Sequence, residues 1–222
     1  MPDVQYFGLS AVRLRGRDGI VLCDPFDRSA GMDMGRPTAH IVTISHAHPH
    51  HNATGAVRPV RDDIFVIDGP GEYEVHGVLI TGTRTRPDAG TAEERGFNTV
   101  YIIHLDDVVF CHLGYLSHEL TQSQLEDIGN IDVLFVPVGD GGTLTPAEAI
   151  NVIGQIEPRI VIPIYYAIDR LSDEYALTAL EKFTNEIGAK DVTPEEKLSV
   201  TPSSLPAEGE ETRILVITPG AS

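Results

Sequence analysis

The sequence predicts an α/β protein in which short β-strands form stacked or strongly twisted sheets. Three observations support this fold class. Eight short β-rich runs separated by turn clusters fill the first two thirds of the chain, two later runs are continuously apolar, and three helix starts follow. With 222 residues, 41% of them hydrophobic, and a uniform texture, the chain is expected to form one domain spanning residues 1–222.

The strands are expected at runs rich in β-branched and aromatic residues. The two continuously apolar runs, IDVLFVPVG and RIVIPIYY, are typical of central strands covered on both faces. Two polar stretches rich in Gly or Pro, residues 86–96 and 201–212, are expected to be loops. The eight earlier runs are VQYFG, AVRLR, GIVLCDP, HIVTIS, IFVIDG, GVLITGT, NTVYIIHL and DVVFCHL.

Helix starts are indicated by their capping residues. Thr121 and Thr145 each precede a Gln or Glu by three residues, the spacing of a capping box, and a proline follows Thr145 directly. A third helix is expected to open at Ser172, with acidic residues in its first turn and Leu177, Leu180 and Phe183 on one face. Its expected end is Gly188.

Composition narrows the classes of function. The formal net charge is -17 with only 16 Lys and Arg residues, so no broad basic face is available for nucleic acid. No apolar run is long enough to span a membrane, and the N-terminus lacks the pattern of an export signal. Cys23 and Cys111 lie in apolar strand-like runs, which favours buried reduced thiols. We therefore expect a cytoplasmic protein with a small-molecule substrate and no nucleic-acid or membrane partner.

The strongest local signal is the run SHAHPHHN, residues 45–52, which follows the strand-like HIVTI. It places four imidazoles within six residues at the end of a strand. Imidazole is a donor suited to zinc, iron, nickel or copper, and a loop after a strand can turn several side chains toward one point. The alternative is a solvated histidine-rich turn.

SHAHPHHN resembles the HxHxDH signature of the metallo-β-lactamase superfamily. Dispersed segments extend the resemblance over nearly the whole chain, toward a branch of predicted zinc-dependent hydrolases akin to ascorbate-6-phosphate lactonases. The resemblance implies a four-layer αββα sandwich with metals at the strand ends between the two sheets. The segments are DPFD, DGPGEYEVHGV, FNTVYIIHLDD, CHLGYLSHELT, DVLFVPVGDGGTLTPAEAINVI, EPRIVIPIYYA and KLSVTPSSLP.

The resemblance also implies a set of metal ligands. His46 and His48 fall on the first two histidines of the signature, and His112 falls on the histidine of the usual HLGD, which together make a complete first site. His51 falls on the last signature histidine, a ligand of the second metal. Asp24, in LCDP, falls on the aspartate that usually supports the histidine loop by hydrogen bonding; a turn-capping role before Pro25 is the alternative.

Four positions depart from the family pattern. His50 replaces the signature aspartate, Tyr115 the bridging aspartate and Tyr165 the last histidine, while Leu9 stands where this branch usually has the histidine of GHS. Without the bridging carboxylate that holds two cations together, a normal dinuclear centre is not expected. Three imidazoles around one zinc would still leave a position for water, so one zinc per chain is expected, with iron, manganese or no metal as alternatives.

The replaced positions have alternative interpretations. His50 and His51 could bind a second metal weakly, or one of them could act as a general base; the alternative is that they form hydrogen bonds around the metal ligands. Tyr115 and Tyr165 either assist catalysis, as hydrogen-bond donors to a substrate oxygen or as ligands of ferric iron, or simply fill the volume of an absent metal.

The leading hypothesis is a metal-dependent hydrolase of an ester, lactone or phosphoester that uses a metal-bound hydroxide. The rival is a catalytically inactive descendant that binds a ligand or a partner. A third hypothesis is an iron-dependent oxidative enzyme that uses the two tyrosines. The glycine turns lack a phosphate-binding fingerprint and no serine stands in a GxSxG context, so nucleotide binding and serine hydrolysis are not expected.

Overall fold

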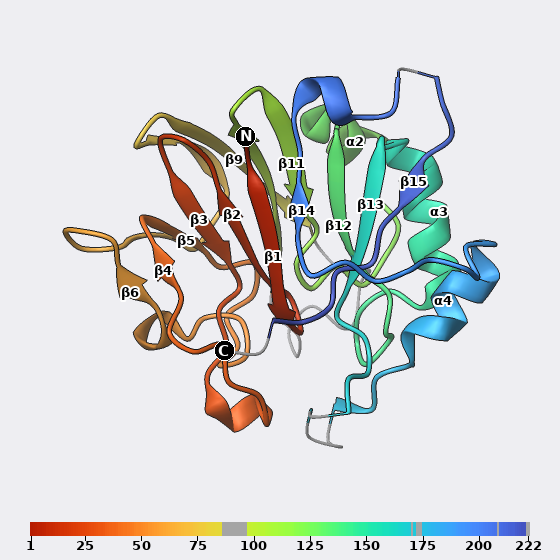
Figure 1. Cartoon of the computed structure of the whole chain (residues 1–222), viewed down its shortest axis with the longest axis horizontal. Helices are drawn as coiled ribbons and strands as arrows, with labels where there is room; N and C mark the ends of the chain where they lie inside the picture. Colours follow the sequence, from red (N-terminus) through yellow and green to blue (C-terminus); the bar gives the residue numbers. More distant parts are fainter. Residues whose placement is uncertain (86–96, 170, 172–174, 208, 221–222) are drawn as a thin grey trace.

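The computed structural model describes residues 1–85, 97–169, 171, 175–207 and 209–220 of the chain. Two large β-sheets stand face to face, and the α-helices lie beside the second of them (Figure 1). The predicted stacking of sheets is confirmed. A short parallel ladder of β4 (Thr38–Ala39) and β6 (Arg58–Pro59) lies outside both sheets.

The first sheet has six strands in the order β14-β1-β2-β3-β5-β7. Its β14, β1, β2 and β3 are antiparallel neighbours, whereas β3, β5 and β7 run parallel. The outer side of β1 and β2 carries polar residues that alternate with buried ones, so it faces solvent. The bounds are β14 (Leu198–Ser199), β1 (Asp3–Gly8), β2 (Ala11–Arg15), β3 (Ile20–Cys23), β5 (Ile41–Thr43) and β7 (Phe65–Ile67).

The second sheet has seven strands in the order β15-β13-β12-β11-β10-β9-β8. The strands from β8 to β11 are antiparallel neighbours, and those from β11 to β15 run parallel. Every residue of β12 and β13 is buried, which confirms the two central strands. The bounds are β8 (Gly71–Val75), β9 (Val78–Thr85), β10 (Asn98–Leu105), β11 (Val108–His112), β12 (Val133–Pro137), β13 (Ile160–Ile164) and β15 (Arg213–Ile214).

Two tight hairpins set the register of the second sheet. His76 and Gly77 link β8 to β9, with φ of 50° and 70°, and Asp106 and Asp107 link β10 to β11, with φ of 49° and 62°. Two successive residues with positive φ are what a type I′ turn requires, and this turn matches the twist of the flanking strands. The first hairpin adds β8, a strand that the sequence patterns did not predict.

The two capping boxes form as predicted. Helix α2 (Gln122–Ile128) starts after Thr121, and α3 (Pro146–Ile156) starts after Thr145; in both, the threonine hydroxyl accepts a backbone N–H and the third residue bonds back. Helix α3 lies along β12 and turns its buried residues toward the sheet. These helices pack against the outer face of the second sheet.

The third helix begins later than predicted. Ser172 lies outside the described residues, and α4 (Leu180–Glu186) starts after Ala179, whose side chain makes no capping bond. Ala176 has φ of 48°, and the backbone N–H of Thr178 bonds to the carbonyl of Gly139 at 2.7 Å. Leu177 therefore precedes the helix, because long-range backbone bonds hold this segment extended. The predicted stop is confirmed: Gly188, with φ of 82°, follows the helix by two residues.

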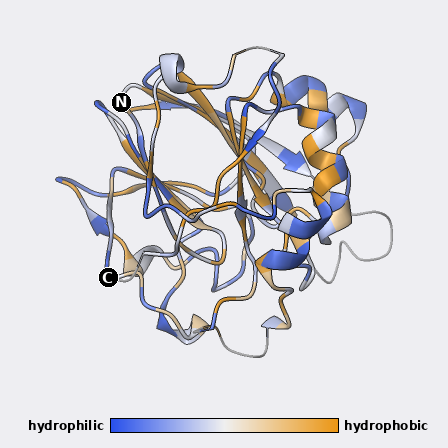
Figure 2. Ribbon diagram, turned by 45° about the vertical axis from the view of Figure 1, so that its right-hand side comes forward, coloured by the Kyte–Doolittle hydropathy of each residue, from blue (hydrophilic) through white to orange (hydrophobic). Residues whose placement is uncertain are grey.

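The core lies between the sheets and beneath the helices, where hydrophobic residues concentrate on the strands (Figure 2). Cys23 and Cys111 are free and fully buried, as predicted, and burial raises the pKa of the Cys23 thiol to about 12. The predicted loop at 86–96 lies outside the described residues, and that at 201–212 includes one 3-10 turn, η4 (Pro202–Ser204). None of the helices described has the length and apolarity to cross a membrane.

Candidate active site

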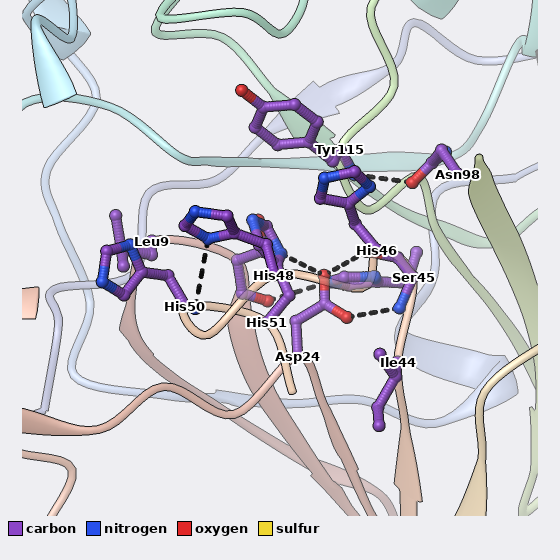
Figure 3. A network of polar contacts seen from close by, with 12 residues as sticks. Leu9, Asp24, Ile44, Ser45, His46, His48, His50, His51, Asn98 and Tyr115 are labelled. Carbon is purple, nitrogen blue, oxygen red and sulfur yellow. Dashed lines mark hydrogen bonds and ion pairs between the residues drawn. The ribbon is translucent and has the colours of Figure 1, made fainter. Parts of the chain in front are cut away.

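Asp24 anchors the histidine loop from below. It follows β3, is fully buried, and its carboxylate accepts the backbone N–H of Ser45 at 2.7 Å, the hydroxyl of Ser45, and Nδ1–H of His51 at 2.9 Å (Figure 3). Burial alone would raise the pKa of Asp24, but the charge and hydrogen bond of His51, with His112 and Ser45, lower it overall. The predicted support of the loop by Asp24 is therefore present as three hydrogen bonds.

The loop after β5 turns three imidazoles to one side. Two backbone hydrogen bonds form tight turns in this loop. The N–H of His48 donates to the carbonyl of His46, and the N–H of His51 donates to the carbonyl of His48, both at 2.8 Å. The ring centroids are 6.2 Å apart for His46 and His48, 5.9 Å for His46 and His51, and 6.3 Å for His48 and His51. The loop thus gathers three of its four histidines.

The hydrogen bonds of these rings fix their tautomers. Nδ1 of His46 donates to the carbonyl of Phe97 at 3.3 Å and Nδ1 of His51 donates to Asp24, so Nε2 of both rings keeps its lone pair. Nδ1 of His48 instead accepts the backbone N–H of His50 at 3.3 Å, which places the proton of the neutral ring on Nε2. Burial lowers the pKa of His46 and of His48, which favours their neutral forms.

Two tyrosines close the space beside these imidazoles. The Tyr115 ring stacks on His46 at 4.9 Å with an interplanar angle of 16°, and Tyr165 lies nearly parallel to His51 at 5.9 Å. The two phenol rings meet edge to face at 5.5 Å. We call His46, His48, His51, Tyr115 and Tyr165 the histidine–tyrosine cluster.

Each tyrosine is held by the second sheet. The Tyr115 hydroxyl donates to the carbonyl of Gly141 at 3.0 Å, and its backbone N–H donates to Oδ1 of Asn98 at 2.8 Å. Tyr165 follows β13, is almost fully buried, and its pKa is raised by burial and by Tyr115. At neutral pH its phenol therefore keeps its proton and remains a hydrogen-bond donor.

His112 is placed differently from the loop histidines. It ends β11, is fully buried, and its Nε2 donates to the carbonyl of Ser10 at 2.8 Å. This bond joins the second sheet to the turn between β1 and β2. Within the described ranges, Nδ1 of His112 has no hydrogen-bond partner, and its ring packs against Phe135 at 6.1 Å. Burial lowers the pKa of His112, and the charges of Asp24 and His51 also act on it, so this predicted ligand lies near the cluster without a ring contact to it among the residues described.

The ring of His50 packs edge to face on His48 at 4.8 Å but lies on the side of His48 away from Tyr115 (Figure 3). Its Nδ1 lies 2.7 Å from the hydroxyl of Tyr175, and its Nε2 lies 3.4 Å from the hydroxyl of Ser29. The remaining histidines lie elsewhere, and two of them, His40 and His76, pack against each other at 4.7 Å. Of the four imidazoles in the run, three belong to the cluster and one binds neighbouring loops.

Three non-glycine residues at the site have left-handed backbone conformations. Leu9, Asp24 and Tyr165 have φ of 47°, 47° and 53°. Such conformations cost on the order of 1 kcal/mol each and persist where surrounding contacts enforce them. Here the carbonyl of Leu9 accepts both the N–H of Tyr165 at 2.8 Å and the hydroxyl of Tyr6 at 2.9 Å. The bond from Tyr165 joins the end of β13 to the turn after β1, and the bond from Tyr6 holds that turn on its own sheet.

Asn98 and Phe97 are the site residues that the sequence patterns missed. Nδ2 of Asn98 donates to Thr85 at 2.9 Å and to the carbonyl of Leu113 at 3.0 Å, while its Oδ1 holds Tyr115. A buried amide at the start of a strand carries no local signature, because its partners come from distant elements.

The donor set does not fit a metal ion in this arrangement. Within the described part of the chain, no three His, Cys, Asp or Glu side chains are placed to share a cation. The hydrogen bonds give the reason: His46 and His51 present free lone pairs, His48 presents a proton, and His112 is bound to a carbonyl. The cluster thus has two free imidazole donors and no free carboxylate.

Two facing sheets with a histidine loop at their strand ends define the class of protein. A protein-family model described as the beta-lactamase superfamily domain matches residues 3–165 of this sequence. The chain therefore belongs to this superfamily, in its metallo-β-lactamase branch. This finding confirms the predicted family and fold class.

Individual relatives agree with this assignment. A solved structure from Thermotoga maritima, provisionally a Zn-dependent hydrolase of the metallo-β-lactamase superfamily, is 30% identical, with 98% of each chain covered and a TM-score of 0.76. A UPF0173 metal-dependent hydrolase of Thermococcus onnurineus is 27% identical over 75% of this chain and 85% of its own length. The corresponding protein of Lysinibacillus sphaericus is 23% identical over 74% and 85%.

Proposed function

We propose that this protein is a hydrolase of a small ester, lactone or phosphoester, with its reaction centre at the histidine–tyrosine cluster. Membership of the metallo-β-lactamase superfamily supports the reaction class, since the relatives are named metal-dependent hydrolases. The substrate class follows the resemblance of the chain to lactonase-like proteins.

The observation that carries the proposal is the buried pair of Asp24 and His51. The carboxylate holds Nδ1–H of the imidazole at 2.9 Å, so Nε2 is left with its lone pair on the side of Tyr115 and Tyr165. A carboxylate in this position fixes the tautomer of a histidine base and stabilises the imidazolium that forms when a water proton is taken. His51 is therefore the residue proposed to accept a proton from the attacking water.

The tyrosines supply the second requirement of ester hydrolysis, which is a donor for the oxygen that gains negative charge. Tyr165 keeps its phenolic proton because its pKa is raised, and its ring lies beside His51. The hydroxyl of Tyr115 donates a hydrogen bond to the carbonyl of Gly141, so its ring forms one side of the site and stacks on His46. Tyr165 is thus the proposed oxyanion donor, and Tyr115 is the proposed wall.

The predicted zinc site, with His46, His48, His51 and His112 as ligands, remains a hypothesis from the family resemblance. Because the described donors do not share a cation position, no step of the mechanism proposed here passes through a metal. If a metal binds through Nδ1 of His48, the N–H of His50 must first be released, whereas Nδ1 of His112 has no partner among the described residues.

Metal content and turnover are the measurements that test this proposal. The purified protein is analysed by elemental mass spectrometry, then assayed with a panel of esters, lactones and phosphoesters, with and without added zinc, iron or manganese. We expect His51→Ala to lower kcat/KM by about 100-fold or more, the usual contribution of a general base. His104→Ala, at an exposed position on β10, is the matched control and should change nothing.

Two outcomes would contradict the proposal. Unchanged turnover in His51→Ala would remove this residue from the mechanism. No turnover of any substrate class under any metal condition would favour the alternative, a superfamily member that binds a ligand or partner without catalysis.

A further inference from the structure

A groove on the outer face of the first sheet lies apart from the histidine–tyrosine cluster. Val12 and Leu14 of β2 point into the core, so the side chains that alternate with them, Arg13 and Arg15, point outward. The groove encloses a cavity of about 630 Å³. Its lining residues are Asp3, Val4, Gln5, Arg13, Arg15, Glu196, Lys197, Thr218, Pro219 and Gly220.

The walls of this groove are fixed by backbone hydrogen bonds. The N–H of Gly220 donates to the carbonyl of Tyr6 on β1, and the N–H of Thr218 donates to the carbonyl of Glu195, both at 2.8 Å. Strand β14, directly after Lys197, pairs with β1 (Figure 1). Three segments that are distant in sequence therefore meet around Arg13 and Arg15.

Three cations gather here in a chain that has few of them. The sequence holds 33 acidic and 16 basic residues, yet Arg13, Arg15 and Lys197 line one groove beside only two carboxylates. In the described part of the chain none of the three forms an ion pair, whereas Arg213 bonds Glu195 at 3.2 Å nearby. The groove therefore has more positive than negative charge.

The two carboxylates offset only part of the charge of the three cations, although Asp3 lies opposite Arg15 across β1 and β2. Oδ1 of Asp3 accepts the hydroxyl of Ser199 at 2.6 Å, which uses part of its capacity. Glu196 is exposed and forms no ion pair among the residues described. Arg13 is half-buried beside the ring of Phe7, at 6.0 Å, and its pKa is lowered by burial and by the charge of Arg15, against a smaller opposing effect of Asp3. Partly buried like charges repel each other, and an anion between them would offset that repulsion.

We propose that this groove is a binding site for a small anion that carries a phosphate or carboxylate group. Arg13 and Arg15 stand two positions apart on one face of a strand, about 7 Å between Cα atoms, so both guanidiniums can reach one tetrahedral or planar group. Lys197 provides a third charge from the opposite wall, and the amide of Gln5 provides a neutral donor. The site is independent of the proposed hydrolase reaction.

Inorganic phosphate is the probe for the first experiment. The full chain is titrated by calorimetry at constant ionic strength, and the titration is repeated with Arg13→Gln, Arg15→Gln and Lys197→Gln. We expect saturable binding to the unaltered protein, and a Kd about tenfold or more weaker in either arginine variant, because each loses a charge-assisted hydrogen bond. Lys197→Gln is expected to show a smaller loss in the same direction.

Arg17→Gln is the matched control. It removes the same charge from the loop after β2, but Arg17 lies outside the groove and contacts Asp18. Its Kd for phosphate should equal that of the unaltered protein. An equal loss in Arg17→Gln would mean general surface electrostatics and would overturn the site.

The proposal is also overturned by an absence of saturable binding at phosphate concentrations up to about 20 mM, well above the weakest range expected for such contacts. Circular dichroism and thermal unfolding check that each variant is folded. Arg13 and Arg15 lie on β2 and Lys197 lies directly before β14, so one unfolded variant leaves the others to decide.

Discussion

The two sheets contribute different kinds of side chain to the candidate site, and their polar groups are hydrogen-bonded differently. The first sheet contributes His46, His48 and His51, whose Nδ1 atoms are all bound by neighbouring groups while their Nε2 atoms remain on the cluster side. The second sheet contributes aromatic rings, and the imidazole at the end of β11, His112, donates to the carbonyl of Ser10. His112 thus matches the position of a metal ligand in the family pattern, although its Nε2 atom forms a buried hydrogen bond.

Removing the charge of Asp24 should have the largest effect on the loop half. In Asp24→Asn an amide would face the N–H and hydroxyl of Ser45, and His51 would lose its anionic partner. Each buried hydrogen-bonding group left unsatisfied typically costs about 1–3 kcal/mol, and the amide would face the partners of three bonds. We therefore expect the free energy of unfolding in urea to fall by about 3 kcal/mol or more.

The exposed Asp18 provides the matched control, since its carboxylate only contacts Arg17 at the surface. Asp18→Asn should change the unfolding free energy by less than about 0.5 kcal/mol. If Asp24→Asn were equally mild, the loop would not depend on its buried carboxylate.

The second prediction separates a ligand from a core residue at His112. His112→Phe keeps an aromatic ring but leaves the carbonyl of Ser10 buried without its donor. The expected loss of unfolding free energy is about 1–3 kcal/mol, the cost of one unsatisfied buried group. If the purified protein holds zinc, elemental analysis should show a smaller loss of zinc in His112→Phe than in His46→Ala. A complete loss of zinc in His112→Phe alone would instead restore its assignment as a ligand.

The sequence predicted most strands and two helix starts because their signals are local. Thr121 and Thr145 form their capping boxes with residues three positions away, so no distant contact is needed. The expected helix at Ser172 differs because Thr178 bonds to Gly139, almost forty residues earlier. Local propensity cannot report such a partner. The short strand β14 was missed for the same reason, since pairing with β1 defines it.

The sequence predicts which histidines gather at the candidate site better than it predicts how their rings are oriented. The density of the run SHAHPHHN and its place after a strand indicated a cluster of imidazoles, and three of them do meet. Which ring nitrogen faces the cluster depends on Phe97, Asp24 and the backbone of His50, and no periodicity encodes these contacts. The direction of His112 likewise depends on a turn about one hundred residues away.

The smallest expected effect concerns the wall formed by Tyr115. Tyr115→Phe removes only the hydroxyl that donates to Gly141 at 3.0 Å, while the ring that stacks on His46 remains. We expect the unfolding free energy to fall by about 0.5–1.5 kcal/mol, the net value of one hydrogen bond, and the His46 imidazole signals in NMR spectra to stay in place. Tyr73→Phe on β8, which loses a hydroxyl bond of 3.2 Å to the carbonyl of Gly69, is the control for stability alone. If Tyr115→Phe moved the His46 signals while Tyr73→Phe did not, the hydroxyl of Tyr115 rather than its ring would position the His46 imidazole. The second sheet would then orient this imidazole through a hydrogen bond as well as through ring stacking.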